Sequence, residues 1–144
     1  MWKVLDHTAD LLVECSAPSW PELLAEAPRC LASLVLGGPE SEEPRQVAGS
    51  MERALEVAGL DANETWVRWW RACLRLLLVE GLVPVGARVD PASSATRALG
   101  VVECATLADL GPLHGADLKA VTWHGAAVEG GDGGGWRGKI VLDV

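Results

Sequence analysis

Ile140-Val141-Leu142-Asp143-Val144 ends the sequence with the alternation of a β-strand. Side chains along a strand point to opposite faces in turn, so Ile140, Leu142 and Val144 share one face, and Val141 and Asp143 share the other. Asp143 is thus a carboxylate on an otherwise apolar strand, and the terminal carboxylate and backbone carbonyls supply further oxygen donors beside it. We expect this part of the chain to meet the acid-rich segment near the beginning of the sequence.

That segment is Asp6-His7-Thr8-Ala9-Asp10, which links predicted strands over residues 2–5 and 11–15. The plainer role for Asp6 is that of a turn residue bonding nearby backbone groups, and His7 could simply order the loop. Asp10 enters an apolar strand, where a carboxylate needs a partner. Two carboxylates about 4 Å apart repel by roughly 4 kcal/mol at an effective dielectric near 20, and a bound cation relieves this repulsion. The two ends therefore predict a divalent-metal site of oxygen ligands, suited to Mg²⁺, Ca²⁺ or Mn²⁺.

The composition limits the class of protein. A chain of 144 residues fits one domain over residues 1–144, and 49% hydrophobic residues exclude global disorder. A net charge of −8 argues against a general binder of phosphate backbones, so no DNA partner is expected. Neither a secretory signal nor an apolar run long enough for a membrane span is present, so we expect a cytoplasmic protein without a membrane partner. Four widely spaced cysteines without C-x-x-C indicate reduced core residues: Cys15, Cys30, Cys73 and Cys104.

Two helices are predicted from capping signals and helical spacing. Ser19 and Glu22 match a capping box before the first helix, which ends at the glycines of residues 37–38. The second helix is predicted from about Ala62 to Glu80 and is closed by Gly81. Its buried stripe consists of Trp66, Trp70, Cys73, Leu74 and Leu77. Further strands are predicted over residues 46–57, 85–89, 98–106, 118–124 and 136–143. The order of elements indicates an α+β fold, with two helices packed on a mixed, largely antiparallel β-sheet.

The predicted strand around Lys119 carries a second group of polar residues. Alternation places Lys119, Val121 and Trp123 on one face, and Ala120, Thr122 and His124 on the other. Lys119 could meet an anionic phosphate or neutralise Asp143. An equally good interpretation is an edge-strand lysine that prevents aggregation. His124 precedes a glycine and could simply cap a hairpin.

Two other motifs have plain interpretations. Residues 133–139 satisfy G-x-x-x-x-G-K, but Ile140 follows instead of Ser or Thr, and a strand follows where a P-loop needs a helix. We therefore interpret residues 130–135 as a flexible hairpin turn. Arg68, Arg71 and Arg75 line one side of the second helix. They form either a solvated face or a contact for RNA or an acidic partner.

Three segments together, residues 6–10, 118–124 and 140–144, resemble the signature segments of the archease family in their order and spacing. The resemblance extends over nearly the whole chain and implies an archease-like α+β fold with a divalent ion held by acidic residues. Carried over by motif, the ion ligands would be Asp10, Asp143 and a main-chain or terminal oxygen of Val144. Lys119 matches the family's functional lysine.

The resemblance also implies a function. Archeases are small cytosolic accessory proteins and not enzymes in their own right. The chain would activate the tRNA-splicing RNA ligase, which joins a 3′-phosphate or 2′,3′-cyclic-phosphate end to a 5′-hydroxyl end. It would promote guanylylation and multiple turnover of that ligase, and it would meet RNA and GTP only through the ligase. The implied cofactor is a divalent metal ion, such as calcium.

Three positions depart from the family pattern. Trp123 stands where the family usually has Tyr, and Arg71 and Ala72 stand where members often carry an acidic pair. If that acid holds the metal or contacts the ligase, we expect weaker metal binding or weaker activation here. Two other functions stay open: a chaperone-like binding module for RNA-processing proteins with a structural ion, and a metal-dependent hydrolase that uses His7 or His124 as its base.

Overall fold

The computed structural model describes residues 1–6, 10–38, 47–130 and 133–144. In chain order, its strands and helices are β1 (Trp2–Asp6), β2 (Asp10–Ala17), α1 (Trp20–Gly37), β3 (Met51–Ala58), α2 (Ala62–Glu80), β4 (Leu82–Val89), β5 (Arg97–Thr106), α3 (Leu107–Leu110), β6 (Ala120–Gly130) and β7 (Trp136–Asp143).

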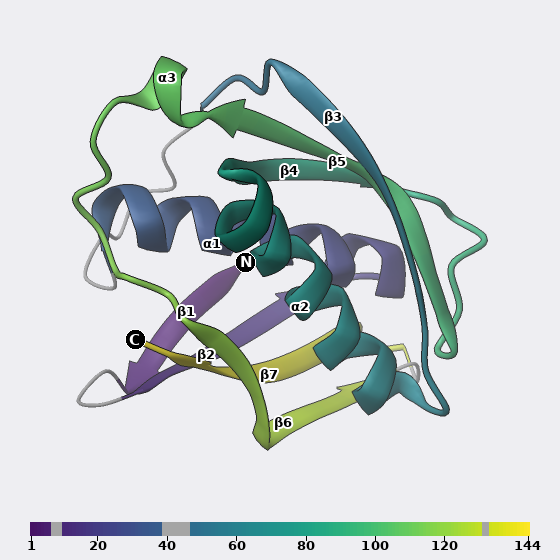
Figure 1. Ribbon diagram of the computed structural model, residues 1–144. Coiled ribbons are helices and arrows are strands. Elements are labelled where there is room, and N and C mark those ends of the chain that lie inside the picture. Colours follow the sequence, from purple (N-terminus) through teal and green to yellow (C-terminus); the bar gives the residue numbers. More distant parts are fainter. Residues whose placement is uncertain (7–9, 39–46, 131–132) are drawn as a thin grey trace.

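The strands form two antiparallel sheets, and α1 and α2 lie between them (Figure 1). One sheet has the strand order β1-β2-β7-β6, and the other has the order β3-β5-β4. Both helices contact strands of both sheets. The predicted α+β class with largely antiparallel strands is confirmed. The structure differs from the prediction in dividing the strands between two sheets and in adding the short α3.

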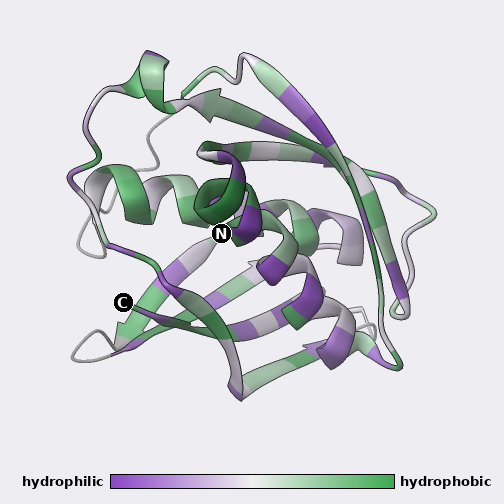
Figure 2. Ribbon diagram, in the orientation of Figure 1, coloured by the Kyte–Doolittle hydropathy of each residue, from purple (hydrophilic) through white to green (hydrophobic). Residues whose placement is uncertain are grey.

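The pattern of apolar residues explains the two sheets. Most of α1 is buried, and much of its ribbon is green, the colour of hydrophobic residues (Figure 2). Such a helix needs cover on more than one side. β3 instead alternates between half-buried and exposed residues along its length, which is the pattern of a strand with one face on the core. The core therefore lies between the two sheets, around the helices.

α2 begins and ends where the local signals place it. Asp61 is its N-cap and accepts a hydrogen bond from the backbone N of Glu64 at 2.8 Å. Gly81 ends the helix with a left-handed backbone at φ 67°, a conformation that favours glycine. The predicted bounds of α2 are confirmed. Ser19 caps α1 in the same way by accepting a hydrogen bond from the N of Glu22 at 3.3 Å.

A cluster of tryptophans ties α2 to the first sheet. Trp66, Trp69 and Trp70 are completely buried. The rings of Trp66 and Trp70 meet edge to face at 5.6 Å between centroids. The indole Nε1 of Trp66 donates to the carbonyl oxygen of Lys139 on β7 at 2.9 Å. Of the predicted stripe, only Leu77 is partly exposed; the other four members are buried.

β6 is longer and less regular than predicted. It continues past the predicted end at His124 and reaches Gly130. Its register with β7 shifts between Thr122 and Ala127, so residues 123–126 lie opposite Ile140 alone. Gly125 lies in this bulge at φ 82°. The interpretation of His124 as a hairpin cap is therefore wrong, because the chain makes a bulge there and continues as a strand.

Two further expectations concern β3 and the cysteines. β3 begins at Met51, later than the predicted start at Gln46, which lies outside the described residues. All four cysteines are free and buried, as predicted. Burial raises the pKa of the Cys104 thiol to about 11 and raises the pKa of each of the other three thiols above its ordinary value. The thiols are therefore protonated near neutral pH and weakly reactive.

Candidate functional site

Asp10 and Asp143 lie directly opposite each other on neighbouring antiparallel strands. Asp10 is the first residue of β2, Asp143 is the last residue of β7, and the two are register partners. Ala120, the first residue of β6, is the partner of Asp143 on its other side. Opposite residues of an antiparallel pair share a face, with Cβ atoms about 4.5–5.5 Å apart. We call Asp10, Asp143 and Ala120 the acidic row.

The acidic row lies on the outer face of its sheet. The neighbouring row consists of Leu11, Leu142 and Val121, which are 1%, 0% and 5% exposed and point into the core. Because side chains alternate along a strand, the acidic row points the opposite way. Asp10 is exposed and Asp143 is half-buried. The two carboxylates are therefore presented to solvent at one end of the sheet.

Among the acids described on this outer face, Glu14 has lysine partners, whereas Asp10 and Asp143 have none within the described residues. Glu14 lies between Lys3 and Lys139, with N–O distances of 3.6 and 3.9 Å. Within the described residues, by contrast, no lysine, arginine or histidine nitrogen lies within 4.0 Å of the Asp10 or Asp143 carboxylate. Two like charges repel more strongly as they approach each other and as the effective dielectric falls. A cation bound between the Asp10 and Asp143 carboxylates would reduce their mutual repulsion.

Lys119 is held beside the acidic row by its backbone. Its amide N donates to the carbonyl oxygen of Asp143 at 2.9 Å, and the preceding Leu118 is buried in the core. The Lys119 side chain is exposed. In the described part of the chain it forms no ion pair with Asp143, so the suggested neutralisation is not seen. The edge-strand interpretation stays open, because Lys119 immediately precedes β6, an edge strand.

The remaining candidate residues lie elsewhere or outside the described part. His124 is exposed in the β6 bulge, opposite Ile140, which is about 10 Å along β7 from Asp143. His7 and the side chain of Asp6 lie outside the described residues, although the backbone of Asp6 pairs with Leu12. The structure therefore brings together Asp10, Asp143 and the Lys119 backbone, and it places His124 apart from them.

The donor set of the acidic row suits a hard cation. Asp10 and Asp143 offer carboxylate oxygens on one face, and the backbone of Val144 follows directly after Asp143. Ions such as Mg²⁺ are commonly bound through one or two carboxylates, with water completing the shell. Among the described residues, no three His, Cys, Asp or Glu side chains gather into a group that could hold a metal ion. The two carboxylates thus fit an oxygen-ligated cation that keeps several waters.

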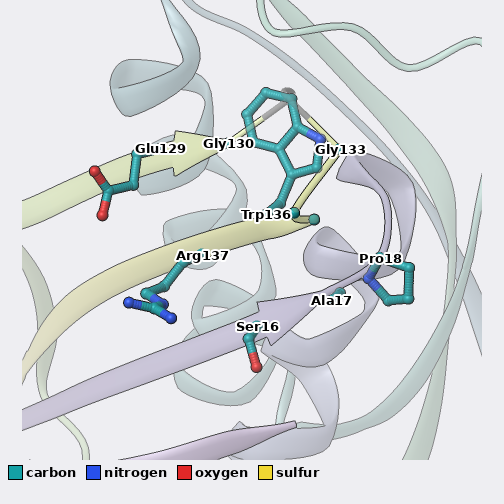
Figure 3. A pocket seen from close by; sticks show the side chains of 10 residues that line it. Ser16, Ala17, Pro18, Glu129, Gly130, Gly133, Trp136 and Arg137 are labelled. Atoms are coloured by element: carbon teal, nitrogen blue, oxygen red, sulfur yellow. The ribbon is translucent and has the colours of Figure 1, made fainter.

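A hollow lies at the end of this sheet that is opposite the acidic row. It has a volume of about 830 Å³ and lies between β2, β7 and the glycine-rich turn, as Figure 3 shows. Trp136 and Arg137 of β7, Ser16 of β2 and Glu129 of β6 line it. The strand β7 runs on directly from this turn, so the rejection of a P-loop is confirmed. The length of β7 separates this hollow from the acidic row by roughly 20 Å.

Arg71, one of the positions at which the sequence departs from the archease pattern, lies against β6. The Arg71 guanidinium donates to the carbonyl oxygen of Val121 from Nε at 3.3 Å and from Nη2 at 3.2 Å. It also lies 5.6 Å from the centre of the Trp123 ring. Arg71 thus joins α2 to the strand that begins at the acidic row. Sequence reasoning missed the exposed Leu78 beside it, although spacing of i, i+4 and i+7 from Arg71 places Arg75 and Leu78 on one side of the helix.

Comparison with known proteins places the chain in a family. The archease protein family (MTH1598/TM1083) matches residues 2–144, so the chain belongs to the archease family. The solution structure of Methanobacterium thermoautotrophicum protein 1598 is similar, with a TM-score of 0.73 and 17% identity over 99% of this chain and 98% of that chain. The crystal structure of an archease from Thermotoga maritima, described as a possible chaperone, has a TM-score of 0.61 and 22% identity over 100% of this chain and 98% of that chain. No curated protein matches the sequence. At these identities, the two structures show a common fold.

In the part of the chain that the structure describes, no helix combines the length and the apolar character needed to cross a membrane.

Proposed function

We propose that this archease is a non-enzymatic activator of the RNA ligase that joins 3′-phosphate or 2′,3′-cyclic-phosphate ends to 5′-hydroxyl ends in tRNA splicing. It promotes guanylylation of the ligase and multiple turnover, and it acts in the cytoplasm. Its direct partner is the ligase, through which it meets RNA and GTP. Membership of the archease family supports this proposal.

The observation that carries the proposal is the register of β2 with β7. It places the Asp10 carboxylate opposite that of Asp143 on a solvent-facing row, and the Lys119 amide is bonded to the Asp143 carbonyl. An acidic pair and the backbone of an exposed lysine therefore lie together at the end of the sheet. A partner protein can approach this end without any rearrangement of the core.

The chemistry of guanylylation fits these groups. Transfer of GMP from GTP to the ligase moves negative charge onto the departing pyrophosphate. Asp10 and Asp143, with a main-chain oxygen of Val144, would hold a divalent ion. Such an ion supplies charge neutralisation and orientation at a phosphoryl group when it is bound. The flexible ammonium group of Lys119 binds phosphate oxygens as a point charge.

The direct test is guanylylation of the purified ligase with GTP labelled at the α-phosphate. The wild-type protein should raise the rate at which the labelled adduct forms, and Asp143→Ala should lower that stimulation at least tenfold. The isosteric Asp143→Asn should do the same, because it removes the charge and keeps the size of the side chain. Glu129→Gln is a matched control, because Glu129 is an exposed acid at the far end of the same sheet. Full stimulation by both Asp143 variants would exclude this role for the acidic row.

A second prediction concerns metal binding without any ligase. In chelator-treated protein, Asp10→Asn should leave the Tm unchanged or raise it slightly, because it removes the repulsion with Asp143. Adding Mg²⁺, Ca²⁺ or Mn²⁺ should raise the Tm of the wild-type protein, since a ligand at 100 times its Kd stabilises the native state by about 2.7 kcal/mol. Asp10→Asn should lose most of that increase. An equal increase in both proteins, measured by differential scanning fluorimetry, would place the metal elsewhere.

The second candidate function is a chaperone-like binding module with a structural ion. The exposed apolar residues Leu78 and Val79, 52% and 67% exposed, favour a protein contact of this kind. This function predicts tight binding of the partner with no change in the rate of nucleotide transfer. Binding and guanylylation measured on the same ligase preparation therefore separate the two functions.

A further inference from the structure

A groove runs between α2 and the start of β6, next to the acidic row. Its volume is about 320 Å³, and it is lined by Arg71, Leu74, Arg75, Leu78, Val79, Ala120 and Val121. We call it the α2–β6 groove. Ala120 belongs both to this groove and to the acidic row, so the two surfaces are continuous around the β6 edge of the sheet.

The groove is apolar in its floor and exposed at one end. Leu74 and Val121 are buried at its base, 3% and 5% exposed. Leu78 and Val79 are more than half exposed, which is unusual for large aliphatic side chains next to each other. An exposed apolar patch beside a hollow is typical of a surface that contacts another protein.

The arginines of the groove lack acidic partners in the described residues. Arg68, one turn earlier on α2, is paired with Glu64 at 2.9 Å and donates to a backbone carbonyl. Arg71 is bonded to a neutral carbonyl and lies over the Trp123 ring, and neither Arg71 nor Arg75 has a described carboxylate oxygen within 4.0 Å. The chain as a whole carries a net charge of −8. The groove is therefore a small basic patch on an acidic protein.

We propose that the α2–β6 groove docks an acidic, amphipathic segment of the partner protein. One apolar side chain of that segment packs on Leu74 and Leu78, and its carboxylates pair with Arg71 and Arg75. This inference rests on the proposed function, because it assigns the surface by which the ligase is held. Because Ala120 pairs with Asp143, the docked segment lies one strand away from Asp143, whose side chain points to the other face of the sheet.

The composition of the groove favours protein over RNA. Two arginines on an apolar floor neutralise too few phosphates for binding to a nucleic-acid backbone, particularly on a chain of this net charge. Arginine is, by contrast, one of the residues enriched at the energetic centres of protein interfaces. Arg71 is already fixed by its contacts with Val121 and Trp123, so it loses little side-chain freedom when a partner binds.

The test compares binding and stimulation of the same purified ligase by full-length variants. Arg75→Glu and Leu78→Asp should each weaken binding at least tenfold in a fluorescence-anisotropy titration. Arg137→Glu and Leu60→Asp are matched controls, because Arg137 is exposed at the far end of the sheet and Leu60 is 88% exposed in the turn before α2. The controls should bind within about twofold of the wild type. Circular dichroism and Tm confirm that each variant is folded.

The outcomes separate this inference from the proposed function. If the wild type stimulates the ligase and folded groove variants bind it normally, the docking surface is wrong and the proposed function stands. If the wild type neither binds nor stimulates the ligase, both are overturned. If the groove variants lose affinity for a labelled RNA and keep their affinity for the ligase, the groove serves RNA, which also overturns the inference. The Asp143→Asn protein should bind the ligase normally and fail to stimulate its guanylylation.

Discussion

Trp66→Ala should lower the free energy of unfolding by about 3–5 kcal/mol, the usual cost of removing a buried aromatic side chain. Trp66 is completely buried, its ring lies against those of Trp20 and Trp70, and its Nε1 binds the carbonyl of Lys139. The substitution removes the contacts by which α2 holds β7, the strand that carries Asp143. Since small domains are stable by only about 5–15 kcal/mol, urea denaturation should show a large decrease in midpoint.

A smaller change keeps this prediction testable if the alanine variant does not fold. Trp66→Phe keeps an aromatic ring and removes the hydrogen bond to Lys139, so we expect a loss of about 1–3 kcal/mol. Trp123→Ala is the matched control, because Trp123 is 45% exposed. Its loss should cost less than about 1 kcal/mol. A Trp66→Ala protein as stable as this control would show that the tryptophan cluster does not support the sheet.

Gly115→Ala is expected to have the second large effect. The backbone N atoms of Gly115 and Ala116 donate to the carbonyl oxygens of Val35 and Leu34 in the last turn of α1, at 3.0 and 2.8 Å. A Cβ on Gly115 would collide with the Leu34 oxygen and would lie 2.5 Å from the Val35 carbonyl carbon. Backbone atoms cannot rotate away, so the segment must move and lose these hydrogen bonds. We expect a loss of about 3 kcal/mol and a Tm lower by about 10 °C.

The control for this prediction is Gly134→Ala. No heavy atom lies within 4 Å of a Cβ built there, and the backbone of Gly134 is not in the left-handed region. Its Tm should change by no more than about 2 °C. Because the segment after Gly115 leads to Lys119, Gly115→Ala should also weaken protection of the Lys119 amide in hydrogen exchange. Equal Tm values for the two variants would contradict the close backbone contact.

Short-range signals made α2 the most predictable element. Its N-cap at Asp61 and its left-handed terminus at Gly81 are local features of the backbone, so the sequence around them contains the whole signal. β6 was predicted less well for the opposite reason. Its bulge depends on how residues 123–126 fit against β7, and a single strand carries no information about its neighbour's register.

The candidate site likewise has a part that local sequence indicates and a part that depends on packing. The types and spacings of its residues suggested Asp10, Asp143 and Lys119. The sequence did not indicate the groove, because its two walls, α2 and β6, are about 45 residues apart in the chain and meet only through packing. Arg71 is the clearest case: its sequence position indicates a residue on a helix face, and only its contacts with Val121 and Trp123 show that it joins two elements.

By itself, the sequence determined the class of fold, the bounds of the second helix, the reduced cysteines and the strand alternation that puts Asp143 among apolar neighbours, because each of these depends on residues close together in the chain. Only the tertiary structure decided that β2 and β7 pair with Asp10 opposite Asp143, that the strands divide into two sheets around the helices, and that a basic groove adjoins the acidic row. Pairings between distant segments arise from burial of the shared core, which no local pattern encodes.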